Sequence, residues 1–327
     1  MLLIENTSLN PAFNLALEEY LLTAVQEDVL CLWRNSQAII IGKNQNTLLE
    51  INPDYVQEHN IAVIRRLTGG GAVFHDPGNI NYTLIQTCGH NDFNNYAKFT
   101  APIISYLKTL DVTATLSGRN DLLIDGAKCS GNAQTVRNGR ILHHGCLLFS
   151  ADLSQLSGAL RPRPIKLQSK GVASVRSRVT NIAQHLKEPM TAEEFLQGLT
   201  HFLRTTLPDV QPYELTQKDI AAVNTLVETR YGTWEWNFGS SPHYSLQLEE
   251  KFPFGLVEAS LLVAEGRISA ITLQGDFFGS ADVSLLEAAL VGIPHRCQDI
   301  AAALPPSLVE QAIFGMTPEL LARFLCQ

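Results

Sequence analysis

Residues 65–82 read RRLTGGGAVFHDPGNINY, and this stretch carries the strongest structural signal in the chain. It continues IAVIRR (61–66), which predicts a strand, and it leads into NYTLIQ (81–86), which predicts another. Between the two, Gly69 to Gly71 allow positive φ and a close approach of backbone N–H groups to a ligand. Arg65 and Arg66 could supply a planar fork for carboxylate or phosphate oxygens. The stretch indicates an anion cradle, although a bare glycine triplet is more often a tight turn with exposed arginines.

A second stretch, GRNDLLIDGAKCSGNAQ (118–134), surrounds Lys128 with small residues. The ammonium could therefore reach a ligand site walled by backbone, although a single lysine is more often solvated beside a turn. Asn120 and Asp121 are either turn residues or polar ligand contacts. Further on, HHGCLLFSADL begins with His143 and His144, a pair that by itself is more often structural than catalytic.

Composition narrows the class of protein. The 327 residues include 24 Lys and Arg against 32 Asp and Glu, a net charge of −8 that argues against a general binder of nucleic-acid backbones. With 45% hydrophobic and 17% charged residues the chain reads as globular, with one large domain and an appendage or two domains. The six cysteines have no short ligand spacing, so reduced thiols fit better than a zinc or disulfide framework. Because we find neither a signal peptide nor an apolar run of about 18 residues, we expect a cytoplasmic protein without membrane contact.

The common nucleotide and hydrolase signatures do not occur. The chain lacks G-x-x-x-x-G-K-S/T, and its glycine triplet lacks the G-x-G-x-x-G spacing of a dinucleotide-binding helix. It also lacks the G-x-S-x-G elbow and H-E-x-x-H. A nucleotide site would need another architecture.

Hydrophobic periodicity predicts alternating helices and strands. Segments 10–26, 95–111, 191–207 and 216–230 read as helices, the first with Asn10 as N-cap and Pro11 at the first helical position. The runs 29–34 and 38–42 look like a pair of strands, 121–136 like a hairpin around Asp125-Gly126, and 141–150 like a further strand. Residues 152–188 show little periodicity and predict a long surface loop. A second hairpin around Glu265-Gly266 and helices to the end predict a small α/β unit that begins near 240–248.

Four stretches together resemble the lipoate-protein ligase family: RRLTGGGAVFHDPGNINY, GRNDLLIDGAKCSGNA, HHGCLL and KGVASVRSRVTNI. They occur in the family's order between Arg65 and Ile182, and TWEWNFG through ITLQGDFF resembles the accessory domain of long bacterial ligases. The resemblance implies an α+β catalytic fold, a mixed sheet flanked by helices and related to class II synthetases. It also implies a catalytic domain over 1–242 and an accessory domain over 248–327.

The resemblance implies a two-step reaction that uses ATP and Mg²⁺. Lipoate first becomes lipoyl-adenylate, and the acyl group then passes to a lysine of a carrier domain. By motif, Lys128 is the catalytic lysine that contacts the acyl carbonyl and the α-phosphate. The nucleotide or adenylate would also contact Arg66, Gly71, Ala72, Val73 and Phe74. Weaker candidates are Arg65, Gly70, Asn79, Asn120, Asp121 and His144, with Asp121 also a candidate magnesium ligand.

The expected partners are lipoyl domains of 2-oxo acid dehydrogenase acyltransferase subunits and the glycine-cleavage carrier protein, with no nucleic acid. An alternative follows from Cys129 and Cys146, which stand where the family usually has Ile or Val and Thr or Ser. It is an ATP-independent octanoyl or lipoyl transferase that works through a cysteine thioester. The accessory segment favours the ligase, and both cysteines are more simply small buried residues.

Charge is unevenly distributed along the chain. Residues 153–187 contain no Asp or Glu, and they carry seven basic residues: Arg161, Arg163, Lys166, Lys170, Arg176, Arg178 and Lys187. We expect this segment to close over an anionic intermediate and to steer an acidic carrier domain.

Overall fold

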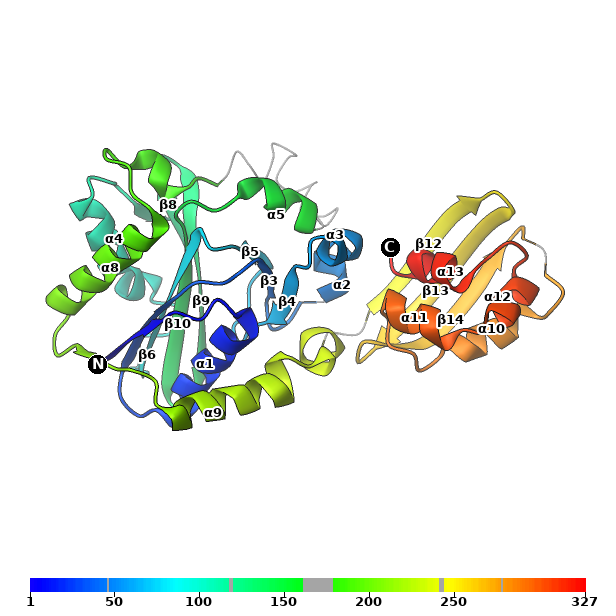
Figure 1. Ribbon diagram of the computed structural model, residues 1–327, viewed down its shortest axis with the longest axis horizontal. Coiled ribbons are helices and arrows are strands. Elements are labelled where there is room, and N and C mark those ends of the chain that lie inside the picture. The colour runs from blue at the N-terminus through cyan, green and yellow to red at the C-terminus, as the bar shows by residue number, and fades with distance from the viewer. Residues whose placement is uncertain (46, 118–119, 161–178, 241–243, 278) are drawn as a thin grey trace. The chain divides into compact units, whose positions relative to one another are not determined.

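The structure is a computed structural model that describes residues 1–45, 47–117, 120–160, 179–240, 244–277 and 279–327 (Figure 1). Six of the seven basic residues of 153–187 lie outside the described residues: Arg161, Arg163, Lys166, Lys170, Arg176 and Arg178. The seventh, Lys187, forms an exposed ion pair with Asp111.

Contacts divide the chain into two units. The larger comprises Met1–Gln45 and Leu49–Thr233, and the smaller comprises Trp234–Gln327 with Asn46–Leu48. The domain boundaries expected from the sequence, 1–242 for the catalytic domain and 248–327 for the accessory domain, remain predictions. No helix within the described ranges is both long and apolar enough to cross a membrane.

The larger unit is built on a mixed sheet of eight strands in the order β11-β1-β2-β6-β10-β9-β8-β7. β1 runs parallel to β2 and β11, and the other neighbours are antiparallel. The strands are β1 (Leu2–Asn6), β2 (Val29–Trp33), β6 (Asn79–Thr87), β7 (Thr115–Ser117), β8 (Asp121–Ile124), β9 (Ala127–Arg137), β10 (Arg140–Leu148) and β11 (Gln211–Pro212). A second sheet has the order β4-β3-β5, with β3 (Ala38–Ile41), β4 (Ala62–Arg65) and β5 (Val73–His75).

Helices flank these sheets, so the structure confirms the expected mixed sheet flanked by helices. The α-helices described before residue 234 are α1 (Pro11–Ala24), α2 (Thr47–Glu50), α3 (Pro53–Glu58), α4 (Tyr96–Thr109), α5 (Leu153–Ala159), α8 (Ala192–Thr206) and α9 (Gln217–Leu226), and a π-helical turn, Val227–Tyr231, follows α9. Asn10 caps α1 as expected, because its side chain accepts hydrogen bonds from the N–H groups of Ala12 and Phe13. Thr191 and Thr216 start α8 and α9 with capping boxes.

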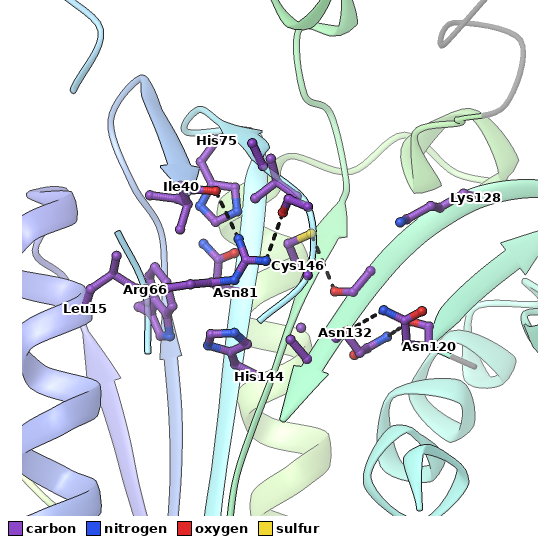
Figure 2. A pocket seen from close by; sticks show the side chains of 18 residues that line it. Leu15, Ile40, Arg66, His75, Asn81, Asn120, Lys128, Asn132, His144 and Cys146 are labelled. Atoms are coloured by element: carbon purple, nitrogen blue, oxygen red, sulfur yellow. Dashed lines mark hydrogen bonds between the residues drawn. The ribbon is translucent and has the colours of Figure 1, made fainter. Parts of the chain in front are cut away.

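Part of one face of the large sheet is polar although it is buried. Along β6, Asn79, Asn81 and Thr83 share this face and are at most 2% exposed. The register places His144 beside Thr83 and Cys146 beside Asn81, and Figure 2 shows Asn81, His144 and Cys146 close together. Helix α1 packs against β6 and β10, with Glu18 bonded to Thr83 on this face. Buried polar side chains on a central strand indicate a site rather than a core.

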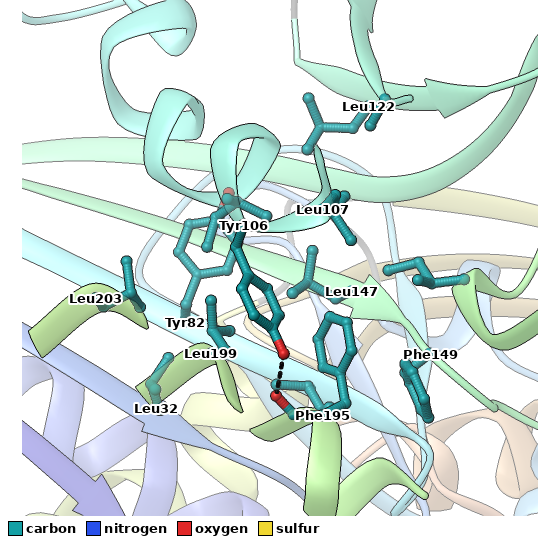
Figure 3. Close-up of a cluster of buried hydrophobic side chains, with 14 of the residues drawn as sticks. Leu32, Tyr82, Tyr106, Leu107, Leu122, Leu147, Phe149, Phe195, Leu199 and Leu203 are labelled. Atoms are coloured by element: carbon teal, nitrogen blue, oxygen red, sulfur yellow. Dashed lines mark hydrogen bonds between the residues drawn. The ribbon is translucent and has the colours of Figure 1, made fainter. Parts of the chain in front are cut away.

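The opposite face of the same strands is apolar. Ile80, Tyr82 and Leu84 alternate with the polar residues of β6 and join the main hydrophobic core (Figure 3). Helices α4 and α8 cover this face, and the Tyr106 hydroxyl donates to the Phe195 carbonyl at 3.1 Å. His143 lies on this side, stacked on Phe99, so strand alternation separates it from His144.

The local structure adds three features that the sequence did not indicate. The runs 29–34 and 38–42 form strands as expected, but they do not pair with each other, since β2 lies in the large sheet and β3 in the small one. The link between them holds the fully buried Asn35 rather than a hairpin turn. The described part of 152–188 is not simply a loop, because it contains α5 and a short 3-10 helix, Ile182–His185. The sequence reading also missed β12, which begins at Tyr244.

The smaller unit is a sheet in the order β12-β13-β14, packed against helices. Its elements are β12 (Tyr244–Phe252), β13 (Gly255–Ala264), β14 (Arg267–Gly275), α10 (Val283–Leu290), α11 (Cys297–Ala303), α12 (Pro306–Ala312) and α13 (Pro318–Leu325). Glu265 and Gly266 both adopt positive φ, as the expected two-residue hairpin requires.

Candidate functional site

A cavity of about 170 Å³ lies on the polar face of the large sheet (Figure 2). Its walls come from α1, the glycine turn and strands of both sheets. The lining residues are Leu15, Trp33, Ile40, Arg66, Gly70, Gly71, Ala72, Val73, His75, Asn81, Asn120, Lys128, Gly131, Asn132, Ala133, His144, Gly145 and Cys146.

The glycine turn is held from within by Arg66, which is only 6% exposed. Its guanidinium donates to the carbonyls of Ile40 at 3.0 Å, Gly69 at 2.7 Å and Gly71 at 2.9 Å, and to the Thr68 hydroxyl at 2.9 Å. Burial lowers the pKa of Arg66 to about 10, so it stays protonated at neutral pH. The expected open fork for substrate oxygens is therefore largely occupied by the turn itself. Arg66 faces the cavity mainly as a fixed positive charge.

Arg65 braces a neighbouring turn and does not line the cavity. It is fully buried, and one guanidinium nitrogen donates to the carbonyls of Gly42, Lys43 and Gln45. A Cβ on Gly42 would lie 2.0 Å from the Gly70 carbonyl oxygen, so the two turns pack backbone against backbone. Gly70 itself has φ +96°, which favours glycine there.

Lys128 lies on the other side of the cavity, on β9. Its ammonium forms an ion pair with Asp121 at 2.8 Å, and both side chains are 35% exposed. A Cβ on Gly131 would come within 2.9 Å of this ammonium, so Gly131 leaves room for it. The backbone of Lys128 is held by Thr180, whose N–H donates to the Lys128 carbonyl at 2.9 Å. The lysine is thus a positioned but accessible cation.

Asn120 is fixed beside Lys128 by a reciprocal pair of hydrogen bonds. Its amide donates to the Asn132 carbonyl at 2.7 Å, and the Asn132 amide donates to the Asn120 carbonyl at 3.0 Å. The buried Tyr82 hydroxyl donates to Oδ1 of Asn132 at 2.5 Å. This series of hydrogen bonds links Tyr82 in the hydrophobic core to Asn120 in the cavity wall.

A second chain of hydrogen bonds connects α1 to the glycine turn. Nδ1 of His144 lies 2.9 Å from the Glu18 carboxylate, and Nε2 lies 2.8 Å from the Thr68 hydroxyl. Thr68 also accepts from Arg66, so its hydroxyl joins the glycine turn to the imidazole of His144. The imidazole in turn contacts the Glu18 carboxylate through Nδ1. On its other side, Glu18 accepts from Thr83 at 2.6 Å.

Glu18 is the end point of this chain and is only 3% exposed. The nearby charge of Arg66 compensates a carboxylate that water cannot reach. The sequence reading treated residues 10–26 as an ordinary amphipathic helix and missed Glu18. A glutamate in a helical pattern is usually solvated, and the only available signal was its place among apolar residues at 15–22.

The structure brings together eight of the predicted site residues at the cavity: Arg66, Gly70, Gly71, Ala72, Val73, Asn120, Lys128 and His144. Asp121 reaches it through its ion pair with Lys128. Arg65, Phe74 and Asn79 do not line it, and Phe74 turns to the side opposite Val73 through strand alternation. Their predicted roles, like those of the other residues, remain predictions.

The two cysteines of the alternative reading differ in environment. Cys129 is fully buried in the hydrophobic core, and burial raises its pKa to about 12, which disfavours a nucleophilic thiolate. Cys146 lines the cavity, and its thiol donates to the Gly131 carbonyl at 3.7 Å. Among the described residues no three His, Cys, Asp or Glu side chains gather as a metal-ligand set.

Two buried histidines should make the free energy of unfolding depend on pH. Burial lowers the pKa of His75 and of His143 to about 3 each. Between pH 6.5 and 3 the unfolded chain binds protons that these side chains refuse in the folded state. The free energy of unfolding should therefore fall with decreasing pH, by up to about 1.4 kcal/mol per pH unit for each histidine. Urea unfolding at pH 7, 6 and 5 measures this decline.

The histidine origin of that decline can be isolated with His143→Phe, which keeps a ring against Phe99. In this variant the free energy of unfolding should fall less steeply with decreasing pH, by up to about 1.4 kcal/mol per pH unit. The exposed His59 supplies a control, since His59→Gln should retain the original slope. A midpoint that does not change between pH 7 and 5 would contradict the prediction.

Comparison with known proteins places the chain among related sequences. Residues 10–204 match the model of the lipoyl protein ligase A/B catalytic domain, and residues 241–325 match that of the bacterial lipoate protein ligase C-terminus. The lipoate-protein ligase LplJ of Bacillus subtilis is 43% identical over 93% of each chain. A bipartite lipoate protein ligase of Thermoplasma acidophilum, studied with its E2 lipoyl domain, matches with TM-score 0.65 and 28% identity over 73% of this chain and 96% of that one. A lipoate-protein ligase A bound with ATP matches with TM-score 0.63 and 27% identity over 73% and 98%.

Proposed function

Because this chain belongs to the lipoate-protein ligase family, we propose that it activates lipoate with ATP and transfers the lipoyl group to a lysine of a lipoyl domain. The protein is an ATP-dependent ligase, and lipoate is its substrate. The observation that carries the residue assignment is Lys128, an accessible ammonium on the wall of a cavity that also contains the glycine turn.

The chemistry requires positive charge at two points. A free carboxylate is a poor acyl donor, so its oxygen must first be converted into a leaving group, which here is AMP. Negative charge develops at the α-phosphate in the first step and at the acyl oxygen in the second. A cation that is already in place at those points stabilises both transition states. We assign this role to Lys128, with Arg66 as a fixed charge behind the glycine turn.

Asp121 orients Lys128 before substrate binds. The 2.8 Å ion pair limits the directions in which the flexible side chain can point. The phosphate of the substrate offers a second negatively charged partner. The Lys128 ammonium can therefore turn away from Asp121 and still have its positive charge balanced. The amide of Asn120, held by Asn132, would contact the same substrate from beside Lys128.

Magnesium would enter with ATP. Mg²⁺ usually binds through substrate phosphates together with one or two carboxylates, and Asp121 is a carboxylate of this kind at the cavity. When bound, the ion would neutralise phosphate charge. The residues of this chain hold and orient the acyl group and the α-phosphate.

Lipoyl domains are the protein partners of this reaction, as in the archaeal system with its E2 lipoyl domain. More specifically, we propose the lipoyl domains of 2-oxo acid dehydrogenase acyltransferase subunits and the glycine-cleavage carrier protein as acceptors. We propose the cytoplasm as the location. All six cysteines are free, which suits a reducing compartment.

A direct assay tests the function. The pure protein should release pyrophosphate from ATP when lipoate and Mg²⁺ are present, and it should increase the mass of an apo-lipoyl domain by one lipoyl group. Omission of ATP should abolish both signals. If the acceptor domain were acylated without ATP, from an octanoylated carrier protein, the cysteine transferase would replace the ligase.

A further inference from the structure

Lys128 reaches the cavity although regular alternation along β9 would turn it away from Gly131. In a β-strand, residues an odd number of positions apart point to opposite faces of the sheet. Gly131 is three positions from Lys128, yet a Cβ on Gly131 would lie 2.9 Å from the Lys128 ammonium. Both residues line the cavity, and Figure 2 shows the Lys128 side chain pointing toward the other labelled residues. The alternation of β9 therefore breaks once between them.

The break is a β-bulge of one residue at Cys129. Leu122 of β8 pairs with Ser130 of β9. The next residue of β8, Leu123, pairs with Lys128, which leaves Cys129 as an extra residue in β9. Cys129 and Ser130 are consecutive, yet both are 0% exposed, and Cys129 belongs to the hydrophobic core. Because two consecutive residues lie on the core side, Lys128 returns to the cavity side.

Two contacts hold the backbone at this bulge. The Cys129 thiol donates to the Leu122 carbonyl at 3.4 Å. The N–H of Thr180 donates to the Lys128 carbonyl at 2.9 Å, and the adjacent Val179 forms a parallel bridge with Lys128. An extra residue disrupts the regular ladder between two strands. A third segment that binds the Lys128 carbonyl therefore fixes the backbone where the ladder is weakest.

We propose that this bulge positions the Lys128 ammonium for the reaction, with Cys129 and Thr180 as positioning residues that act through the backbone of Lys128. The inference rests on the proposed function, in which this ammonium contacts the acyl carbonyl and the α-phosphate. β-Bulges are common beside active sites, where they change the direction of a side chain. Here the bulge brings the ammonium over Gly131 and within 2.8 Å of Asp121, the partner of Gly131 on β8. This role needs the buried side chain of Cys129 and not a reactive thiol.

Thiol labelling of the full-length protein tests the direction of residue 128 independently of activity. In Lys128→Cys, iodoacetamide should alkylate the new thiol about tenfold faster than the native Cys129, because reactivity follows exposure and thiolate content. Cys129 should react as slowly as the buried Cys31. Peptide mapping by mass spectrometry gives the rates. A regular strand would place residue 129 on the cavity side, so equal rates, or faster labelling of Cys129, would overturn the bulge.

Thr180→Pro tests the anchor, because proline has no N–H to donate to the Lys128 carbonyl. It should lower kcat for adenylate formation about tenfold through misplacement of the ammonium. The KM for ATP should stay at the wild-type value, since the glycine turn is not altered. Thr180→Ala keeps the N–H and should retain most of the wild-type kcat. Equal kcat values for the two variants would refute the anchor.

Hydrogen exchange of the wild-type protein checks the same anchor without a substitution. The Thr180 amide should be protected, because its proton is bonded to the Lys128 carbonyl. Exchange at the rate of an unstructured peptide would overturn the anchor even if Thr180→Pro failed to fold. A wild-type protein that released no pyrophosphate from ATP and lipoate would refute the proposed function instead. The labelling and exchange results would then still decide whether the bulge exists.

Discussion

Replacing Lys128 with methionine is expected to lower the rate of adenylate formation about a hundred- to a thousandfold. Methionine keeps the length of the side chain and removes the charge that stabilises the developing anion. The fold should survive, because a half-exposed ion pair such as Lys128 with Asp121 contributes at most about 1 kcal/mol. Pyrophosphate release measures the first effect and urea unfolding the second.

Lys187 provides the matched control for this substitution. It also forms a 2.8 Å ion pair with an aspartate, Asp111, but its side chain is 75% exposed and does not line the cavity. Lys187→Met should retain the wild-type rate of pyrophosphate release. A folded Lys128→Met protein that released pyrophosphate as fast as Lys187→Met would remove Lys128 from the chemistry.

Replacing Glu18 with glutamine is expected to raise the KM for ATP about tenfold and to lower stability by a few kcal/mol. A series of hydrogen-bond contacts leads from Arg66 through Thr68 and His144 to the Glu18 carboxylate, which also accepts from Thr83. A glutamine would replace one carboxylate oxygen by an amide donor, so the side chain could not accept from both sides as the carboxylate can. The charge of Arg66 would also lose its buried counterion. Both changes loosen the glycine turn, which the nucleotide must contact.

Glu19 provides a control that separates the effect of Glu18 on ATP binding from its effect on stability. It is the next residue of α1 and equally buried, at 4% exposed. Its carboxylate pairs with Arg137 and Arg230 and accepts from the Tyr231 hydroxyl, away from the glycine turn. Glu19→Gln should therefore lower stability and leave the KM for ATP unchanged. Identical KM values for the two variants would show that Glu18 acts only through overall stability.

The parts of the site that could be predicted from sequence are those whose residues are contiguous. Gly69 to Gly71 follow a strand directly, and Lys128 stands among small residues after a hairpin turn. In such cases local backbone chemistry already restricts what the segment can do. The order of four motifs then identified the family and, with it, the mixed sheet and the small C-terminal unit.

The remaining residues could not be read in this way because their role depends on what packs above them. Asn79 and Asn81 alternate with apolar residues along β6, a pattern typical of a strand with one solvated face. Helix α1 covers that face, so both amides are buried. The same cover buries Glu18, which a helical pattern alone would leave in water. Arg66 shows the reverse case, because its motif predicts contact with substrate. In the structure its guanidinium instead donates to the carbonyls of Ile40, Gly69 and Gly71.

The amino-acid sequence by itself determined the family, the chemistry that the family implies and the lysine to which we assign the charge-stabilising role. These follow from residue types at short spacings, which local geometry preserves in any environment. Only the tertiary structure decided which polar groups are buried, which of them bond to one another and which have no partner among the described residues. Those properties arise where α1, the glycine turn and the large sheet meet. A hydrogen bond between residues 18 and 144, or an unpaired donor at residue 81, exists only when distant segments exclude water together.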